Sequence, residues 1–199
     1  MPKIGLRDPY YAIVTLGTDS STGAETESIG AAKRLAKAVQ LQTNINAPTT
    51  KFYADDGVSE SVTEFIDGSG TLLVDDLDDD AEKDLYNATK LATSNDIVNK
   101  SEDGSAYARL GYVVRRIKNG VQSYRGIILA RVQFQIASDQ WDTKGEQIVF
   151  TGSQLPFNIY RDVKSVWRKK SEWKSSYSTA SSWMLAQLVQ ADLSVNPVT

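Results

Sequence analysis

Apolar and polar residues alternate along much of the chain with the two-residue period of β-strands, whose successive side chains point to opposite faces. Residues 31–46 are ambiguous, because helix-forming residues fill the first half and strand-like alternation the second, where we favour a strand. The pattern predicts strands over residues 9–16, 39–45, 58–66 and 71–77, and polar loops over 17–28, 48–57 and 93–105.

The clearest motif is a long hairpin around Asn119-Gly120, a dipeptide that favours a two-residue type I′ turn. Its strands are predicted over residues 106–117 and 121–136. Counting outward from the turn predicts an apolar face made by three cross-strand pairs: Val114 with Arg125, Tyr112 with Ile127, and Leu110 with Leu129. The opposite face of the hairpin carries both apolar and charged residues. Either the chain's own helix or another subunit covers this second face, and both interpretations stay open.

A second hairpin is predicted from residues 146–151 and 155–160, around Gly152-Ser153. Pro156 lies inside its second strand and cannot donate a backbone hydrogen bond. We therefore predict that this strand is an edge of the sheet.

Two helices are predicted. The first covers residues 80–90, where Asp79 and Glu82 have the spacing of a capping box and apolar residues then recur on one face. The second covers residues 179–191 and is flanked by polar segments, which is typical of an appended element. The predicted organisation is a β domain over residues 1–175 and a C-terminal helical extension over 176–199.

Composition narrows the classes of function. The chain has 199 residues, with no cysteine and no histidine. Disulfides, thiol nucleophiles, histidine-dependent triads and nearly every zinc site are thereby excluded. An enzyme would have to use a pair of carboxylates, and no two acids are specifically placed for that. We expect no enzyme and no cofactor.

The acidic run over residues 75–82 suggests a calcium loop. An EF-hand loop that began at Asp76 would need glycine at the position of Ala81 and glutamate at that of Asn87, and both requirements fail. Charges at the start of a helix and on a solvated face explain the run, so we expect no metal site.

The formal net charge is −3, from 22 basic and 25 acidic residues, which argues against a dedicated nucleic-acid-binding protein. Basic residues over 115–118 and 161–174, the second group with Trp167 and Trp173, could stack on bases. We favour ordinary surface charge, with the tryptophans in the core or an interface. No apolar run approaches the roughly 20 residues of a membrane span. The first five residues lack the apolar core of a signal peptide, so we expect assembly in the host cytoplasm and no membrane partner.

Four segments occur in a recognisable order: GLRDPYYA at residues 5–12, YADDG at 53–57 followed by VDDL at 74–77, LGY at 110–112 with the 119–120 turn and Tyr124, and TKGE at 143–146 before a strand pair that ends in Arg161-Asp162. With this order and spacing, the chain resembles the major tail protein (tail tube protein) family of long-tailed bacteriophages (siphoviruses) of Gram-positive hosts. The resemblance covers roughly residues 4–165, and residues 166–199 lie outside it.

The resemblance implies a mainly β fold, a β-sandwich or partial barrel with one flanking α-helix, here with an added C-terminal helix. It implies a structural subunit of the virion tail that self-assembles into stacked hexameric rings, whose joined sheets enclose the channel for DNA ejection. The implied partners are further copies, the tape-measure protein, the tail-terminator and distal tail proteins, and double-stranded DNA in transient, non-specific passage. The alternative is a carbohydrate- or host-binding β-sandwich module of a phage decoration or fibre protein.

Candidate site residues follow from the resemblance, from the mixed face of the hairpin and from the last predicted helix, which could dock on a neighbouring subunit. We expect subunit interfaces at Phe52, Tyr53, Asp55, Asp56, Gly57, Arg115, Tyr124 and Trp183. A channel wall with many phosphate contacts would stall ejection, so we expect the lumen to be neutral or acidic. Glu60 and Glu64 are the lumen candidates.

Overall fold

The computed structural model describes residues 3–54, 57–91, 93–94, 96–136 and 152–195. Over these residues the protein is mainly β with two α-helices, which confirms the predicted fold class. The strands are β1 (Lys3–Thr18), β2 (Glu25–Ile29), β3 (Lys33–Arg34), β4 (Ala38–Asn46), β5 (Thr49–Ala54), β6 (Gly57–Thr63), β7 (Asp67–Val74), β8 (Thr89–Lys90), β9 (Ile97–Val98), β10 (Tyr107–Lys118), β11 (Val121–Phe134), β12 (Ser153–Tyr160) and β13 (Arg168–Lys170), and the helices are α1 (Asp79–Tyr86) and α2 (Tyr177–Leu188).

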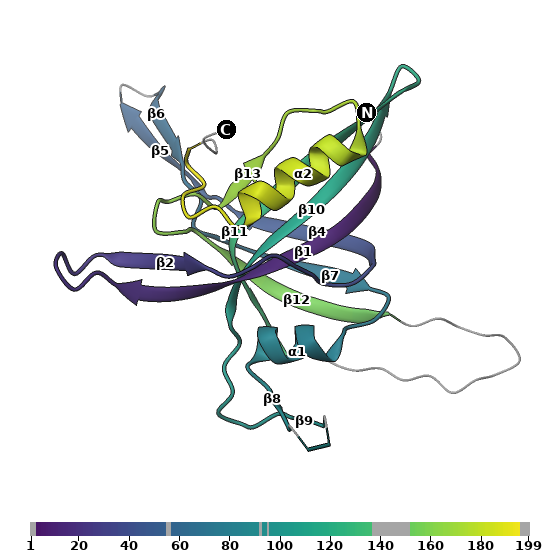
Figure 1. The fold of residues 1–199 in the computed structure, drawn as a ribbon. Helices are drawn as coiled ribbons and strands as arrows, with labels where there is room; N and C mark the ends of the chain where they lie inside the picture. Colours follow the sequence, from purple (N-terminus) through teal and green to yellow (C-terminus); the bar gives the residue numbers. More distant parts are fainter. Residues whose placement is uncertain (1–2, 55–56, 92, 95, 137–151, 196–199) are drawn as a thin grey trace, which may run out of the picture.

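One nine-stranded antiparallel sheet forms the body of the protein (Figure 1). Its main path runs β2-β1-β10-β11-β12-β7-β4, while β3 pairs with β1 and β13 pairs with β11. Within the described part of the chain, β2 and β4 are the ends of this path, each hydrogen-bonded to one neighbouring strand. The hydrogen-bonded path is therefore open, and at one of its ends β4 also lies against β1.

The central hairpin of the sheet is β10–β11. Asn119 and Gly120 have φ angles of 51° and 76°, and a type I′ turn requires positive φ at both positions. The three predicted cross-strand pairs, including Tyr112 with Ile127, are confirmed.

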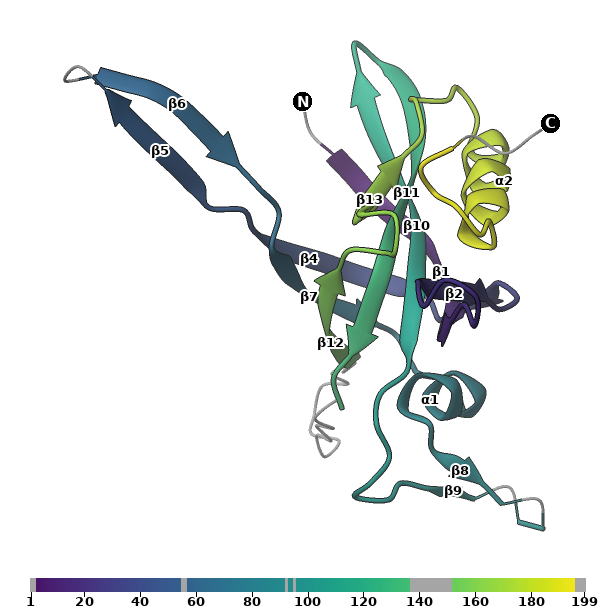
Figure 2. The same cartoon turned by 90° about the vertical axis from the view of Figure 1, so that its left-hand side faces the viewer.

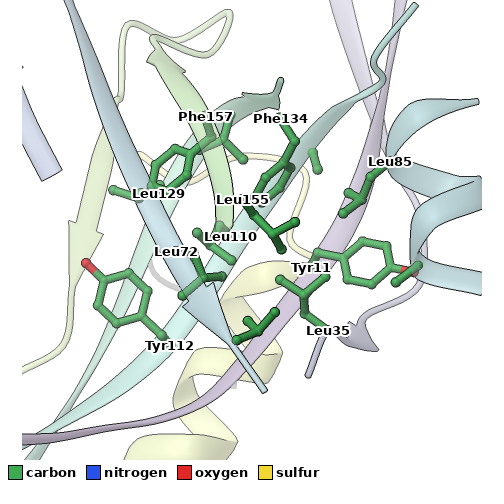
Figure 3. Close-up of a cluster of buried hydrophobic side chains, with 14 of the residues drawn as sticks. Tyr11, Leu35, Leu72, Leu85, Leu110, Tyr112, Leu129, Phe134, Leu155 and Phe157 are labelled. Atoms are coloured by element: carbon green, nitrogen blue, oxygen red, sulfur yellow. The ribbon is translucent and has the colours of Figure 1, made fainter. Parts of the chain in front are cut away.

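The apolar face of β10–β11 forms the main core (Figure 3). Leu110 and Leu129 from this hairpin meet Leu72 of β7, and all three side chains are fully buried. Phe134 and Phe157 extend the core, with ring centroids 5.6 Å apart. Helix α1 closes one end of this core with buried side chains that include Leu85.

Helix α2 covers the opposite face of the hairpin. Of the two interpretations of this face, coverage by the chain's own helix is therefore correct. Ala180, Met184 and Leu188 are buried there in a second apolar cluster. The helix lies so close that a Cβ atom on Gly111 would be 2.6 Å from Met184 Sδ, and one on Gly126 would be 2.8 Å from Trp183 Cε3. Gly111 and Gly126 in the sheet thus make room for α2. The predicted division into a domain over residues 1–175 and an extension over 176–199 stays a prediction.

The prediction that the strand containing Pro156 is an edge is wrong, because β12 lies between β11 and β7. The Pro156 carbonyl accepts a hydrogen bond from Gln135 N at 2.8 Å, just beyond the end of β11. The N–H and C=O groups of one strand residue point to the same side of the strand. The backbone nitrogen of Pro156, which has no hydrogen to donate, therefore also faces the end of β11 and not β7. The ladder between β12 and β7 loses nothing. The predicted partner strand over 146–151 lies outside the described residues.

The start of α1 also differs from the prediction. The N-cap is Asp78, whose side chain makes no capping hydrogen bond, so the predicted capping box at Asp79 is wrong. The helix ends at Tyr86 because Asn87 adopts a left-handed conformation with φ of 53°.

The predicted loops over 17–28, 48–57 and 93–105 all contain strand residues, in β1, β2, β5, β6 and β9. The most prominent case is β5–β6, which pair only with each other and project from the body as a two-stranded ribbon, hereafter the arm (Figure 2). Six residues of strand span about 20 Å. The predicted strand over residues 58–66 corresponds to β6, whereas β5 was missed, because its residues 49–52 are all exposed and show no apolar alternation.

Candidate functional site

One face of the arm carries two large exposed apolar side chains. The strand register sets Phe52 opposite Glu60 and Thr50 opposite Val62, which places all four on the same face. The side chains of Phe52 and Val62 are 65% and 62% exposed. Large apolar groups in such a position mark a surface that another molecule covers.

The base of the arm is fixed to the body. Arg161 forms an ion pair with Glu64 at 3.2 Å, and the ring of Phe65 stacks on Trp167 with centroids 4.6 Å apart and planes 1° apart. These two contacts fix the orientation of the arm at its base, while β5 and β6 extend away from the sheet (Figures 1 and 2).

Half of the ten sequence-predicted site residues lie on this arm or at its base. Phe52 and Tyr53 lie on β5, Gly57 and Glu60 lie on β6, and Glu64 follows β6 at the base. Asp55 and Asp56 lie outside the described residues. The described candidates Phe52, Tyr53, Gly57 and Glu60 thus share one projection with Glu64 at its base, and neither lumen candidate lies on the face of the large sheet.

The other three interface candidates lie around α2. Arg115 is opposite Tyr124 in the β10–β11 register, and the ring of Tyr124 meets that of Tyr177 edge-on at 5.9 Å. Trp183 packs over Gly126 and is half-buried. Tyr124 and Trp183 therefore contribute to the packing of the chain's own helix.

The outer face of β4, β7 and β12 is uncharged over three rungs of the sheet, and all but Leu73 and Pro156 of its nine residues are polar. The register aligns Gln42 with Thr71 and Pro156, and the flanking rungs have the same character. We call this surface the amide face; it comprises Gln40, Gln42, Asn44, Ser69, Thr71, Leu73, Gln154, Pro156 and Asn158. It reaches the free edge of the sheet at β4 and has no charged side chain among these nine positions.

A groove of about 500 Å³ opens at the end of the main core nearest the β10–β11 turn. Leu41, Tyr112 and Ile127 contribute to its apolar lining, and Arg125 and Arg168 are its arginines. The complete lining is Gly5, Leu6, Val39, Gln40, Leu41, Thr43, Tyr112, Val114, Arg125, Ile127, Arg168, Lys170 and Trp173, which contains no acidic residue.

Arginines in and beside the groove stack on tryptophans. The guanidinium carbons of Arg116 and Arg125 lie 3.8 and 4.5 Å from the ring centroid of Trp173, and that of Arg168 lies 4.1 Å from Trp167. Burial lowers the pKa of Arg125, and the neighbouring charge of Arg116 lowers it further. No carboxylate of the described residues forms an ion pair with these three arginines. The groove therefore favours an anionic ligand.

The core end of the groove makes stability sensitive to alkali. Burial raises the pKa of Tyr112 to about 12, against the weaker opposite effect of Arg168. Between about pH 10 and 12 the unfolded chain has lost the phenol proton that the folded chain keeps, so stability falls as pH rises, by at most about 1.4 kcal/mol per pH unit for this group. Denaturant unfolding across this range should show the slope, and Tyr112→Phe should reduce it. Ultraviolet titration in which every tyrosine of the folded protein ionises near pH 10 would contradict this prediction.

Sequence reasoning missed the groove and the amide face. A signal for the amide face was present, because Gln40, Gln42 and Asn44 alternate with residues that include Leu41. The groove is assembled from five segments far apart in the chain, and only the pairing of Arg125 with Val114 on an otherwise apolar face hinted at it.

Among the described residues, no group of three or more acidic side chains could hold a metal ion. No helix in the described part of the chain is long and apolar enough to span a membrane. Comparison with protein-family models and with curated proteins finds no match to the chain. The surfaces themselves therefore carry the functional argument.

Proposed function

We propose that this protein is a structural subunit of a phage tail tube, which assembles into stacked rings around the channel for DNA ejection. The observation that carries the proposal is the amide face at the free edge of the sheet. Open sheet edges are normally covered, and pairing with another copy is one way to cover them. Copies joined along this edge would extend the amide face into a continuous β wall.

The chemistry of the amide face suits a channel for DNA. Protein affinity for DNA depends strongly on neutralised phosphates, and the nine positions of the amide face offer no cation. A wall of amides and hydroxyls hydrates well and holds the passing phosphates weakly. We therefore assign the lumen to the amide face in preference to Glu60 and Glu64, which lie on and beside the arm.

The arm supplies a second contact between copies. Its exposed Phe52 and Val62 need a partner surface, and its projection from the body lets it reach a neighbouring subunit. In the proposed virion tail, the further partners are the tape-measure protein, the tail-terminator and distal tail proteins, and transiently passing DNA, after assembly in the host cytoplasm.

The competing function, a carbohydrate-binding module, would need an exposed aromatic platform. The three described tryptophans are engaged: Trp167 with Phe65, Trp173 with arginines, and Trp183 with Gly126. The amide face is polar enough to bind a sugar, but none of its nine positions is aromatic.

Electron microscopy of the purified, concentrated protein tests the proposal. We expect rings or hollow tubes of uniform width, and a reconstruction should place Gln42, Asn44 and Thr71 on the channel wall. A wall dominated by arginine and lysine would contradict the lumen assignment. A protein that stays monomeric at every concentration, with and without a tail-assembly initiator, and that binds selectively on a glycan array would establish the competing function.

A further inference from the structure

We propose that the groove is the receptor for the arm of a second copy of this chain. The inference rests on the proposed function, because it assigns one contact within the same assembly. It names the two surfaces that meet and the chemistry that matches them.

The groove has the two properties that such a receptor needs. Its apolar lining includes Leu41, Val114 and Ile127, which can cover an aromatic side chain. Arg125 and Arg168 add positive charge without a carboxylate partner in the described part of the chain, and Lys170 adds a third cation to the lining. An apolar group flanked by acids is the complementary ligand.

The end of the arm has that composition. Residues 52–60 read FYADDGVSE, with two aromatic residues, three acids and no basic residue. Phe52 and Glu60 lie opposite one another on the exposed face, so an apolar group and an acid are presented together. Glu60 on the arm therefore matches Arg125 and Arg168 in the groove, and Phe52 matches the apolar lining.

The arm reaches the groove of another copy rather than its own. It leaves the end of β4 and runs away from β10, β11 and β13, which contribute six of the thirteen residues that line the groove (Figure 2). The base contacts of Glu64 with Arg161 and of Phe65 with Trp167 oppose folding back. An arm and a groove at different places on one subunit make a head-to-tail contact, which repeats from copy to copy.

Crosslinking tests the contact cleanly, because the natural chain has no cysteine. Val62→Cys on the arm and Val39→Cys in the groove are made in separate proteins, and both positions are well exposed, at 62% and 60%. The two proteins are mixed under assembly conditions with a short bismaleimide. We expect a crosslinked dimer of the two different variants. Thr22→Cys, in the exposed turn between β1 and β2, replaces Val39→Cys in the matched control and should crosslink to the arm at least about tenfold less, a difference of about 1.4 kcal/mol in contact free energy.

A charge exchange gives the second measurement. The double variant Arg125→Glu, Arg168→Glu should lose tube formation and arm crosslinking while unfolding as the native protein does. For crosslinking, the Arg125→Glu, Arg168→Glu protein also carries Val39→Cys, and a second protein carries Val62→Cys with Glu60→Arg. Mixing these two proteins should restore the crosslink, because opposite charges then meet again.

The results separate the two proposals. Normal tubes from the Arg125→Glu, Arg168→Glu variant, or equal crosslinking to Thr22→Cys and Val39→Cys, would overturn the receptor assignment and leave the tube subunit standing. Absence of both tubes and crosslinks in the unaltered pairings would overturn both.

Discussion

Replacement of Arg109 by methionine is expected to lower the free energy of unfolding by about 2–4 kcal/mol, measured by denaturant titration. Arg109 is completely buried between the sheet and the end of α2. Its guanidinium lies 3.7 Å from the Glu27 carboxylate, whose side chain is 1% exposed. Glu27 keeps its ion pair with Arg131, whose Nε donates to Glu27 Oε1 at 2.9 Å, so the loss comes mainly from the buried carbonyls that Arg109 serves.

Arg109 also connects three parts of the fold. Its Nε donates to the Ala130 carbonyl at 3.4 Å, and its Nη1 donates to the carbonyls of Leu188 and Gln190 at the end of α2. The C-terminal end of a helix is its negative end, so a buried cation there stabilises the docking of the helix. The loss of these bonds would leave buried carbonyls without a donor.

Two comparisons establish that burial causes the effect. Arg34→Met removes the Arg34–Asp8 ion pair, whose side chains are 53% and 25% exposed, and should cost no more than about 1 kcal/mol. Glu27→Gln should itself destabilise the protein, and the double variant Glu27→Gln, Arg109→Met should cost less than the sum of the two changes. Equal small losses for Arg109→Met and Arg34→Met would refute the structural role of Arg109.

The sequence was most informative where local chemistry decides the structure. The β10–β11 register followed from Asn119-Gly120, because a two-residue turn fixes which residues lie opposite one another. Pro156 led to a wrong prediction because only its local chemistry was considered. The N–H that it lacks would face the point where β11 ends, so no strand loses a hydrogen bond, and the sequence does not reveal which strands lie beside β12.

The candidate site was predictable only in part. The resemblance to tail tube proteins singled out residues 52–57, and of these Phe52, Tyr53 and Gly57 lie on the projecting arm. The groove and the role of Arg109 depend on long-range contacts, since Arg109 meets Glu27 and Gln190 across a large separation in the chain. Periodicity along one segment carries no information about such a meeting.

Removal of the arm is expected to abolish assembly while leaving the fold nearly as stable. The variant replaces residues 49–63 with Asn-Gly between Pro48 and Glu64. Glu64 N already donates to the Pro48 carbonyl at 3.4 Å, which is the hydrogen bond that closes a two-residue hairpin turn. Phe65 and its stack on Trp167 are retained.

The arm buries little within its own subunit, so the shortened protein should unfold within about 1 kcal/mol of the natural one. It should form no tubes by electron microscopy, because the exposed Phe52 and Val62 would no longer join copies. A matched control, Thr50→Ser with Thr63→Ser on the same arm, keeps the exposed apolar groups and should assemble normally. Tubes of ordinary length from the shortened protein would show that sheet edges alone hold the assembly together, whereas a large loss of stability would show that the arm belongs to the fold and not to the interface.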